Sequence, residues 1–536
     1  MLLAVMASGM ISRALPLPIP LPLLQIVMGA IIAGVFDHGV RLNPEIFFLL
    51  FLPPLLFLDG WRIPKEGVFK DKFAILELAF GLVIFTVVGL GLLISWMIPS
   101  MPLPVAFALA AIVSPTDPVA VSAITRRVPM PGRIMHILEG ESLLNDASGL
   151  VAFRFAVAAA VTGAFSLSSA AVSFVWVAVG GLSVGTGFTW AVALAKNLFS
   201  RRYGEDTGPQ ILLSLLIPFG AYMLAEHLAA SGILAAVAAG VTMSYVELSG
   251  RSMAATRMER TAVWNTVQFT LNGIVFVLLG EQLPALLDGA VQVVRETGHH
   301  NPGWLVIYAL AINLALAVLR FGWVWLSLSL GKILASYRGQ QAPEINMRLV
   351  LATSLAGVRG AITLAGVLTL PLTLADGSPF PARDLAIFLA AMTIIISLLV
   401  ASIGLPRILA GLPPVIETAY QQQRTLAEEM ARQAAIKGIE KTLYDLTQAN
   451  PDDSRIFTTT AARIIDGFQQ QVAGGLEPGV EAELVQRQAG IEAQMRLAAL
   501  RASRQELFRL ARHGKISDQL AREMVRRLDL QEARLL

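Results

Sequence analysis

Three short stretches place ionisable side chains inside runs that are otherwise apolar. In the first, SPTDP, Asp117 lies between two prolines within the apolar run 104–124. A carboxylate at the centre of a bilayer helix costs roughly 2.5 to 3.5 kcal/mol on insertion scales. Because Pro115 and Pro118 each remove a backbone donor, the helix should unwind at Thr116 and Asp117, where free carbonyls can coordinate a cation. The Asp117 carboxylate can also cap the half-helix that follows.

The second stretch is GESLLNDASGL, residues 140–150. On a helix Glu141 and Asn145 share a face, and Asp146 lies about 100 degrees further round, so the two acids can serve different partners.

A third stretch, GVRGAITLAG, residues 357–366, surrounds Arg359 with glycines that permit a broken helix. The guanidinium of Arg359 cannot lose its proton and needs an acid, which Glu141 or Asp117 could supply. One early and one late interrupted span, both charged, indicate a transporter whose site lies between inverted repeats. If spans two to seven and eight to thirteen are the halves, the breaks fall in the fourth and fifth spans of their halves.

The composition requires a membrane setting for these charges. The 536 residues are 55% hydrophobic with a mean hydropathy of +0.65, and no cysteine is present for a thiolate metal site. We predict an all-α polytopic membrane protein with about thirteen transmembrane helices and two discontinuous crossing helices. The expected spans are 1–15, 20–36, 45–61, 74–98, 104–124, 141–164, 171–195, 209–227, 231–248, 264–287, 303–331, 349–374 and 385–410.

Basic residues alternate between connections. They gather near residues 13, 62–72, 126–133, 196–202, 251–260 and 332–348, whereas the intervening loops hold only Arg41, Arg295 and Arg383. This distribution predicts an N-terminus outside and a cytoplasmic C-terminal tail. The formal net charge of +3 then reports orientation and does not indicate nucleic-acid binding. In residues 411–536, segments 421–446 and 482–535 have the pattern of amphipathic helices.

Other ionisable residues within the spans have ordinary explanations. Glu77 and His227 lie near span ends and are expected to be structural or interfacial. Arg154 and Arg320 are expected to neutralise helix carbonyls or neighbouring carboxylates. The further acids within the spans are Asp59 and Glu226.

The sequence resembles the bacterial sodium/proton antiporters of the NhaP kind and the eukaryotic sodium/hydrogen exchangers. The stretches that carry the resemblance are LPPLLFLDGW, SPTDPVAV, GESLLNDASGLV, AEHLAASGILAAVAAG and GVRGAITLA, in order across residues 52–366. It implies a transmembrane antiporter domain in residues 1–410, with dimerisation and moving core parts, a helical cytoplasmic tail in 411–536, and a homodimer in the inner (plasma) membrane.

The resemblance also implies roles for single residues. Asn145 and Asp146 hold the transported Na⁺, Thr116 and Asp117 lie at the crossing of the unwound helices, and Ser142 lies near the ion. Glu141 and Arg359 form a structural ion pair that joins helices, and Asp59 matches an acid of the third span.

The implied activity is exchange of sodium or lithium for protons. Relatives whose exchange carries net charge place a second Asp where this chain has Asn145, so an electroneutral 1:1 exchange by alternating access is expected. No cofactor and no catalytic residue are expected, and an intramembrane aspartyl protease is disfavoured because the spans hold no GxGD motif. A potassium/proton antiporter with the same site is the alternative, and a cation channel is a weaker one.

Overall fold

The structure is a computed structural model. It describes residues 1–14, 19–35, 44–62, 71–125, 130–163, 167–204, 206–248, 254–296, 301, 303–337, 346–374 and 377–410, and, further along, 433, 436–448, 454–455, 457–462, 465, 528 and 530–532. The chain divides into two compact units, Met1–Pro414 and Val415–Leu536.

The first unit is helical, and each predicted span corresponds to one described helix or to consecutive helices. The spans are α1 (Leu2–Ala14), α2 (Leu21–Val35), α3 (Pro44–Arg62), α5 (Lys72–Leu76) continuing through the π-helix η1 (Glu77–Leu82) into α6 (Val83–Met97), α7 (Leu103–Val113) with α8 (Pro118–Thr125), α9 (Gly132–Thr162), α10 (Leu167–Tyr203), α11 (Thr207–His227), α12 (Gly232–Leu248), α13 (Ala254–Glu296), α14 (Gly303–Tyr337), α15 (Met347–Leu355) with α16 (Ala361–Leu368), and α17 (Arg383–Leu409).

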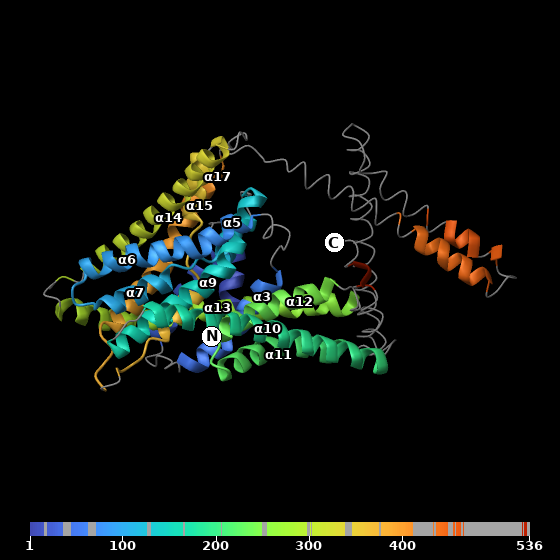
Figure 1. Cartoon of the computed structure of the whole chain (residues 1–536), viewed down its shortest axis with the longest axis horizontal. Helices are drawn as coiled ribbons and strands as arrows, with labels where there is room; N and C mark the ends of the chain where they lie inside the picture. Colours follow the sequence, from blue (N-terminus) through green and yellow to red (C-terminus); the bar gives the residue numbers. More distant parts are fainter. Residues whose placement is uncertain are drawn as a thin grey trace. The chain divides into compact units, whose positions relative to one another are not determined.

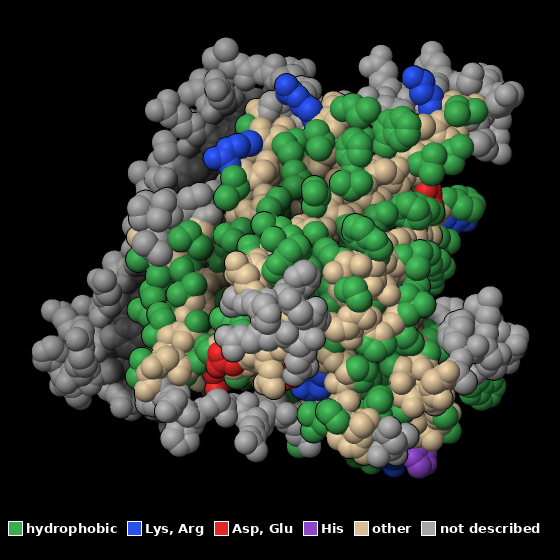
Figure 2. Space-filling model, turned by 90° about the vertical axis from the view of Figure 1, so that its left-hand side faces the viewer, with side chains coloured by type: hydrophobic (Ala, Val, Ile, Leu, Met, Phe, Trp, Pro, Cys, Tyr) green, Lys and Arg blue, Asp and Glu red, His purple; other side chains and the backbone are tan. Residues whose placement is uncertain are grey.

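The outer surface matches this assignment. Among the described residues, seven helices are long and apolar enough to cross a membrane, and four shorter ones are apolar. Hydrophobic side chains cover most of the face in Figure 2, and its few charged side chains lie near the margins. The prediction of an all-α polytopic membrane protein is confirmed, whereas the number of about thirteen transmembrane helices is consistent with the structure and stays a prediction.

The tail and the orientation are described less fully. Residues 436–448, within the predicted segment 421–446, are helical, whereas nearly all of 482–535 lies outside the described residues. Many basic connections, including 63–70, 126–129 and 338–345, also lie outside them. The domain boundary at residue 410 and the orientation therefore stay predictions.

The spans of the first unit form two groups. The paired group contains α1, α2, α3, α10, α11, α12 and α13, within which α2 packs on α13 and α3 packs on α12. The broken-helix group contains α5, η1, α6, α7, α8, α9, α14, α15, α16 and α17 (Figure 1). The groups meet where α13 packs on α17 and α16 and where α3 packs on α16.

Reciprocal glycines explain the two pairings of the paired group. A Cβ on Gly29 of α2 would overlap the backbone of α13, and one on Gly280 of α13 would overlap α2. Gly60 of α3 and Gly240 of α12 repeat this relation. Helices in a membrane associate closely where small residues let their backbones approach.

These pairings correct the predicted boundaries of the repeats. The second span pairs with the tenth and the third pairs with the ninth, as expected if spans one to six and eight to thirteen are the halves. Both breaks, α7/α8 and α15/α16, then fall in the fifth span of their half. Corresponding spans of the two halves are seven positions apart and each crossing reverses the chain direction, so the halves have opposite orientations. The division into spans two to seven and eight to thirteen was wrong because it counted the linking span α10 with the first half.

The two broken spans face each other across their unwound segments. The backbone N–H of Asp117 donates to the carbonyl of Val358 at 2.7 Å. Arg359 donates through Nε to the carbonyl of Val113, the last residue of α7, at 2.8 Å and through Nη1 to Gly357. The carboxylate of Asp117 lies against Gly360, the N-cap residue of α16. A positive charge thus lies near helix C-termini and a negative charge near an N-terminus, which matches the helix dipoles.

A buried ion pair holds α9 to α14. Arg320 donates to both carboxylate oxygens of Glu141 at 2.5 and 2.7 Å, and both side chains are buried. Arg320 also donates to the carbonyl of Thr353 on α15 at 3.1 Å. The predicted pairing of Glu141 with Arg359 is therefore wrong in the described structure, where Glu141 pairs with Arg320. The guanidinium of Arg359 donates instead to backbone carbonyls that the broken helices leave unpaired.

We predict that Gly360→Ala destabilises the protein by about 1 to 3 kcal/mol, the usual cost of overpacking. The φ of −128° at Gly360 suits any residue, so the effect is steric, from a Cβ that meets the Asp117 side chain. Gly322→Ala on α14 is the control, since a Cβ there meets nothing within 4 Å. Thermal unfolding in detergent measures both variants. Equal melting temperatures for the two would contradict the close contact.

We predict that Arg320→Met costs about 3 to 5 kcal/mol, because it leaves the buried carboxylate of Glu141 without its counter-charge. The double variant Arg320→Met/Glu141→Gln should recover most of this loss, since no unpaired charge remains. Denaturation monitored by tryptophan fluorescence compares the three proteins. A double variant less stable than Arg320→Met alone would be inconsistent with this pairing.

Candidate cation site

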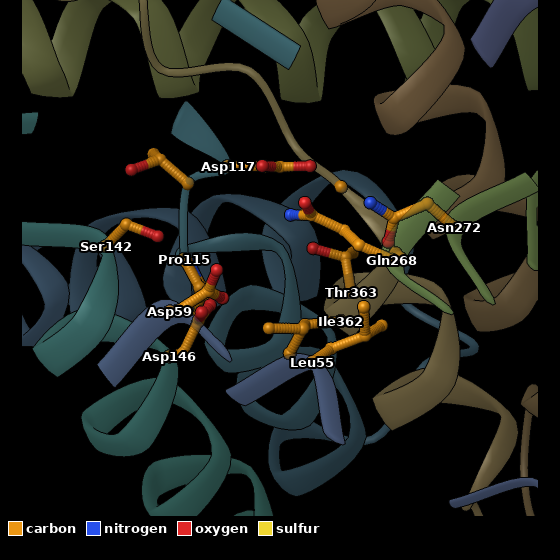
Figure 3. Close-up of a pocket in the computed structure, with 13 residues that line it drawn as sticks. Leu55, Asp59, Pro115, Asp117, Ser142, Asp146, Gln268, Asn272, Ile362 and Thr363 are labelled. Carbon is orange, nitrogen blue, oxygen red and sulfur yellow. The ribbon is translucent and has the colours of Figure 1, made fainter. Parts of the chain in front are cut away.

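A cavity lies between the two helical groups, at the crossing of the broken spans. The empty space within its lining, counted together with space open to solvent, is about 440 Å³. Its lining comes from α3 and α13 of the paired group and from α9, the unwound segments and α16 of the broken-helix group: Leu55, Asp59, Pro115, Thr116, Asp117, Ser142, Asp146, Gln268, Asn272, Gly360, Ala361, Ile362 and Thr363 (Figure 3).

Asp146 is the most deeply buried acid that lines the cavity. Its side chain projects from α9, and the residue is only 5% exposed. Asp59 of α3 and Asp117 line the same cavity, and both lie near enough for their charges to interact with Asp146. Asp146 forms no salt bridge with any described residue. A buried carboxylate without a fixed counter-charge can bind a proton or a cation.

Asn145 is held in place beside Asp146 by a small hydrogen-bond network. Its Nδ2 donates to Thr116 Oγ1 at 3.0 Å and to Glu141 Oε1 at 3.3 Å, and Thr116 Oγ1 donates to Glu141 Oε1 at 3.3 Å. The Asn145 Oδ1 is buried without a hydrogen-bond partner in the described structure. Buried acceptors are nearly always paired, so this oxygen is a candidate ligand.

The structure brings most of the predicted site residues to this cavity. Asp59, Thr116, Asp117, Ser142 and Asp146 line it, whereas Asn145 does not line it and is joined to the lining residue Thr116 by a hydrogen bond. Carboxylate, hydroxyl and carbonyl oxygens are hard ligands, which suit alkali ions.

Two amides of α13 line the cavity but were missed by the sequence analysis. Gln268 and Asn272 lie on the side of the cavity away from Asp59 and Asp146 in Figure 3. Their i, i+4 spacing within the apolar run 264–287 was the available signal. Neutral amides cost less to bury in an apolar run than ionised side chains, so they stand out less in the sequence.

The surroundings of Glu77, Arg154 and His227 fit the structural or interfacial roles expected for them. Glu77 accepts a hydrogen bond from Ser327 at 2.7 Å, and Arg154 pairs with Glu226 at 3.2 Å. His227 is exposed in the last turn of α11.

Comparisons with known proteins agree with this geometry. The family described as sodium/hydrogen exchanger, transmembrane, matches residues 1–411. The chain is 40% identical over its whole length to an uncharacterized Na⁺/H⁺ exchanger of Escherichia coli K12, YjcE, and covers 98% of that protein. It is 48% identical over 76% of its length to a sodium, potassium, lithium and rubidium/H⁺ antiporter of Bacillus pumilus, of which the match spans 60%.

Solved structures carry the same fold. The sodium proton antiporter MjNhaP1 from Methanocaldococcus jannaschii, at pH 8, superposes with a TM-score of 0.57 at 19% identity, over 76% of this chain and 97% of that one. The family match over residues 1–411 and the 40% identical relative together establish that the chain belongs to the sodium/hydrogen exchanger family.

Proposed function

We propose that this protein exchanges sodium or lithium ions for protons across the membrane, with Asp146 as the carboxylate that binds either ion. The observation that carries the proposal is the position of Asp146, which lines a cavity between the two helical groups beside the unwound segment of a broken span. Oxygens of Thr116, Ser142 and Asn145 would complete the coordination, and Asp59 and Asp117 would add negative charge near the ion.

Competition at one carboxylate is sufficient for exchange. A carboxylate in a partly dehydrated cavity binds a proton more tightly, whereas a nearby cation favours its ionised form. Asp146 therefore holds a proton or a sodium ion but not both. Moving a bare carboxylate through the apolar barrier would cost several kcal/mol, so the site crosses only when it is loaded.

The division into two groups supports a mechanism of alternating access. The cavity has one wall on the paired group and the other on the broken-helix group, so displacement of one group past the other would change its accessible side. We propose that the broken-helix group carries Asp146 across while the paired group forms the contact of a homodimer. In this proposal the protein lies in the inner (plasma) membrane, with its N-terminus on the outer side and its C-terminal tail in the cytoplasm.

The cation preference has a second candidate. Relatives from Bacillus pumilus and Bacillus subtilis, 48% and 45% identical to this chain, are named sodium, potassium, lithium and rubidium/H⁺ antiporters. These names support potassium as a further substrate at the same site. Collapse of a pH gradient in proteoliposomes, challenged separately with Na⁺, Li⁺, K⁺ and Rb⁺, distinguishes the two candidates.

We predict that Asp146→Asn abolishes cation-driven proton movement in proteoliposomes without unfolding the protein. An amide occupies the same volume but can neither release a proton nor neutralise a cation. Asp206→Asn, at the N-cap of α11, is the matched control and should retain exchange, because asparagine also caps helices and Asp206 does not line the cavity. Exchange that survives in folded Asp146→Asn would refute the role of this acid.

We predict that exchange moves no net charge, since one monovalent cation replaces one proton at a single carboxylate. On a solid-supported membrane, a sodium concentration jump should produce proton movement detected by a pH dye but no transient current above that of Asp146→Asn. A current that scales with the exchange rate would show instead that a second acid joins the transport cycle, for which Asp59 and Asp117 are the candidates because they line the same cavity.

A further inference from the structure

The helices α3 and α13 each carry residues that line the cavity and, about one turn away, a residue that is exposed. On α3 the residues become less buried from Leu55 through Asp59 to the exposed Arg62. On α13 Asn265 is exposed and Gln268 is half-buried. Since Leu55, Asp59 and Gln268 line the cavity, Arg62 and Asn265 form the next layer outward.

Arg62 joins the two helices in that outer layer. Its Nη1 donates to Gln268 Oε1 at 2.7 Å, and its Nη2 donates to Asn265 Oδ1 at 2.6 Å. The two amides are three residues apart, so they lie on one face of α13 and match the planar guanidinium. One of the acceptors, Gln268, is itself a lining residue. A fixed positive charge is thereby held in contact with a residue that lines the cavity.

This charge acts on the same ions that the cavity binds. Arg62 lies one turn beyond Asp59 on α3, and the charges of the two residues interact. A cation that enters along α3 and α13 must pass the guanidinium, which repels it and lowers its local concentration. The guanidinium also occupies the Gln268 oxygen, a neutral ligand that an entering cation could otherwise use.

We propose that Arg62 is a positively charged gate residue at one mouth of the cavity, which lowers cation occupancy until Gln268 is released. The inference rests on the proposed function, because it concerns entry to the same site. Both helices that hold Arg62 belong to the paired group, so the gate stays with that group and controls one mouth only.

The test compares half-saturating cation concentrations for purified full-length variants. Arg62→Gln removes the charge, Arg62→Lys keeps it without the forked hydrogen bonds, and Arg201→Gln removes an exposed charge at the end of α10, away from the cavity lining. Sodium and potassium are titrated in proteoliposome exchange and in thermal stabilisation of the detergent-solubilised protein. The second measurement reports binding whether or not protons are exchanged.

Arg62→Gln is expected to lower the half-saturating concentration about three- to tenfold, and added choline chloride should narrow this difference by screening. Arg201→Gln should stay close to the wild type, and Arg62→Lys, which keeps the charge but not the paired hydrogen bonds, should fall between the wild type and Arg62→Gln. An unchanged value for Arg62→Gln, or an equal fall in Arg201→Gln, overturns the gate. A rise in Arg62→Gln also overturns it, since Arg62 would then act by supporting the charge of Asp59. If the wild type binds sodium but exchanges nothing, the proposed function fails while the thermal titration still decides the gate.

Discussion

The need to satisfy interrupted backbone inside a membrane determines where the candidate site lies. An unwound segment leaves N–H and carbonyl groups without partners, and hydrocarbon provides none. Here the two broken spans satisfy each other, through the bond from Asp117 to Val358 and the bond from Arg359 to Val113, while Arg359 also donates to Gly357 within its own segment. The same crossing that neutralises the backbone brings Thr116 and Asp117 to the cavity. Polar groups tolerated for structural reasons thus become available to a cation.

The helix α9 carries two buried acids that have opposite surroundings. Glu141 is fully neutralised by Arg320 and accepts further hydrogen bonds from Thr116 and Asn145, so it behaves as a fixed part of the fold. Asp146, five residues further on, lines the cavity and has no salt bridge among the described residues. Their spacing turns them to different faces of α9. A structural and an exchangeable carboxylate can therefore coexist on one helix.

Much of this arrangement could be predicted from the sequence, because the penalties in a membrane are large. Pro115 and Pro118 reveal the break in the fifth span, and Asp146 stands out because charge in an apolar run is costly. The partner of Glu141 could not be predicted, since Arg320 and Arg359 both lie in late spans and only packing decides between them. Gln268 gave a weak signal because neutral amides cost less to bury than charges.

The reciprocal glycines of the paired group bear on how the protein can move. At Gly29, Gly60, Gly240 and Gly280 the helices touch through main-chain atoms, with no side chain between them that could change rotamer. Such contacts resist sliding, so each of the two helix pairs should move as a rigid unit. The displacement proposed for transport is then confined to one slip plane, where α13 meets α16 and α17 and where the cavity lies. The ion would travel along the seam at which the molecule is able to shear.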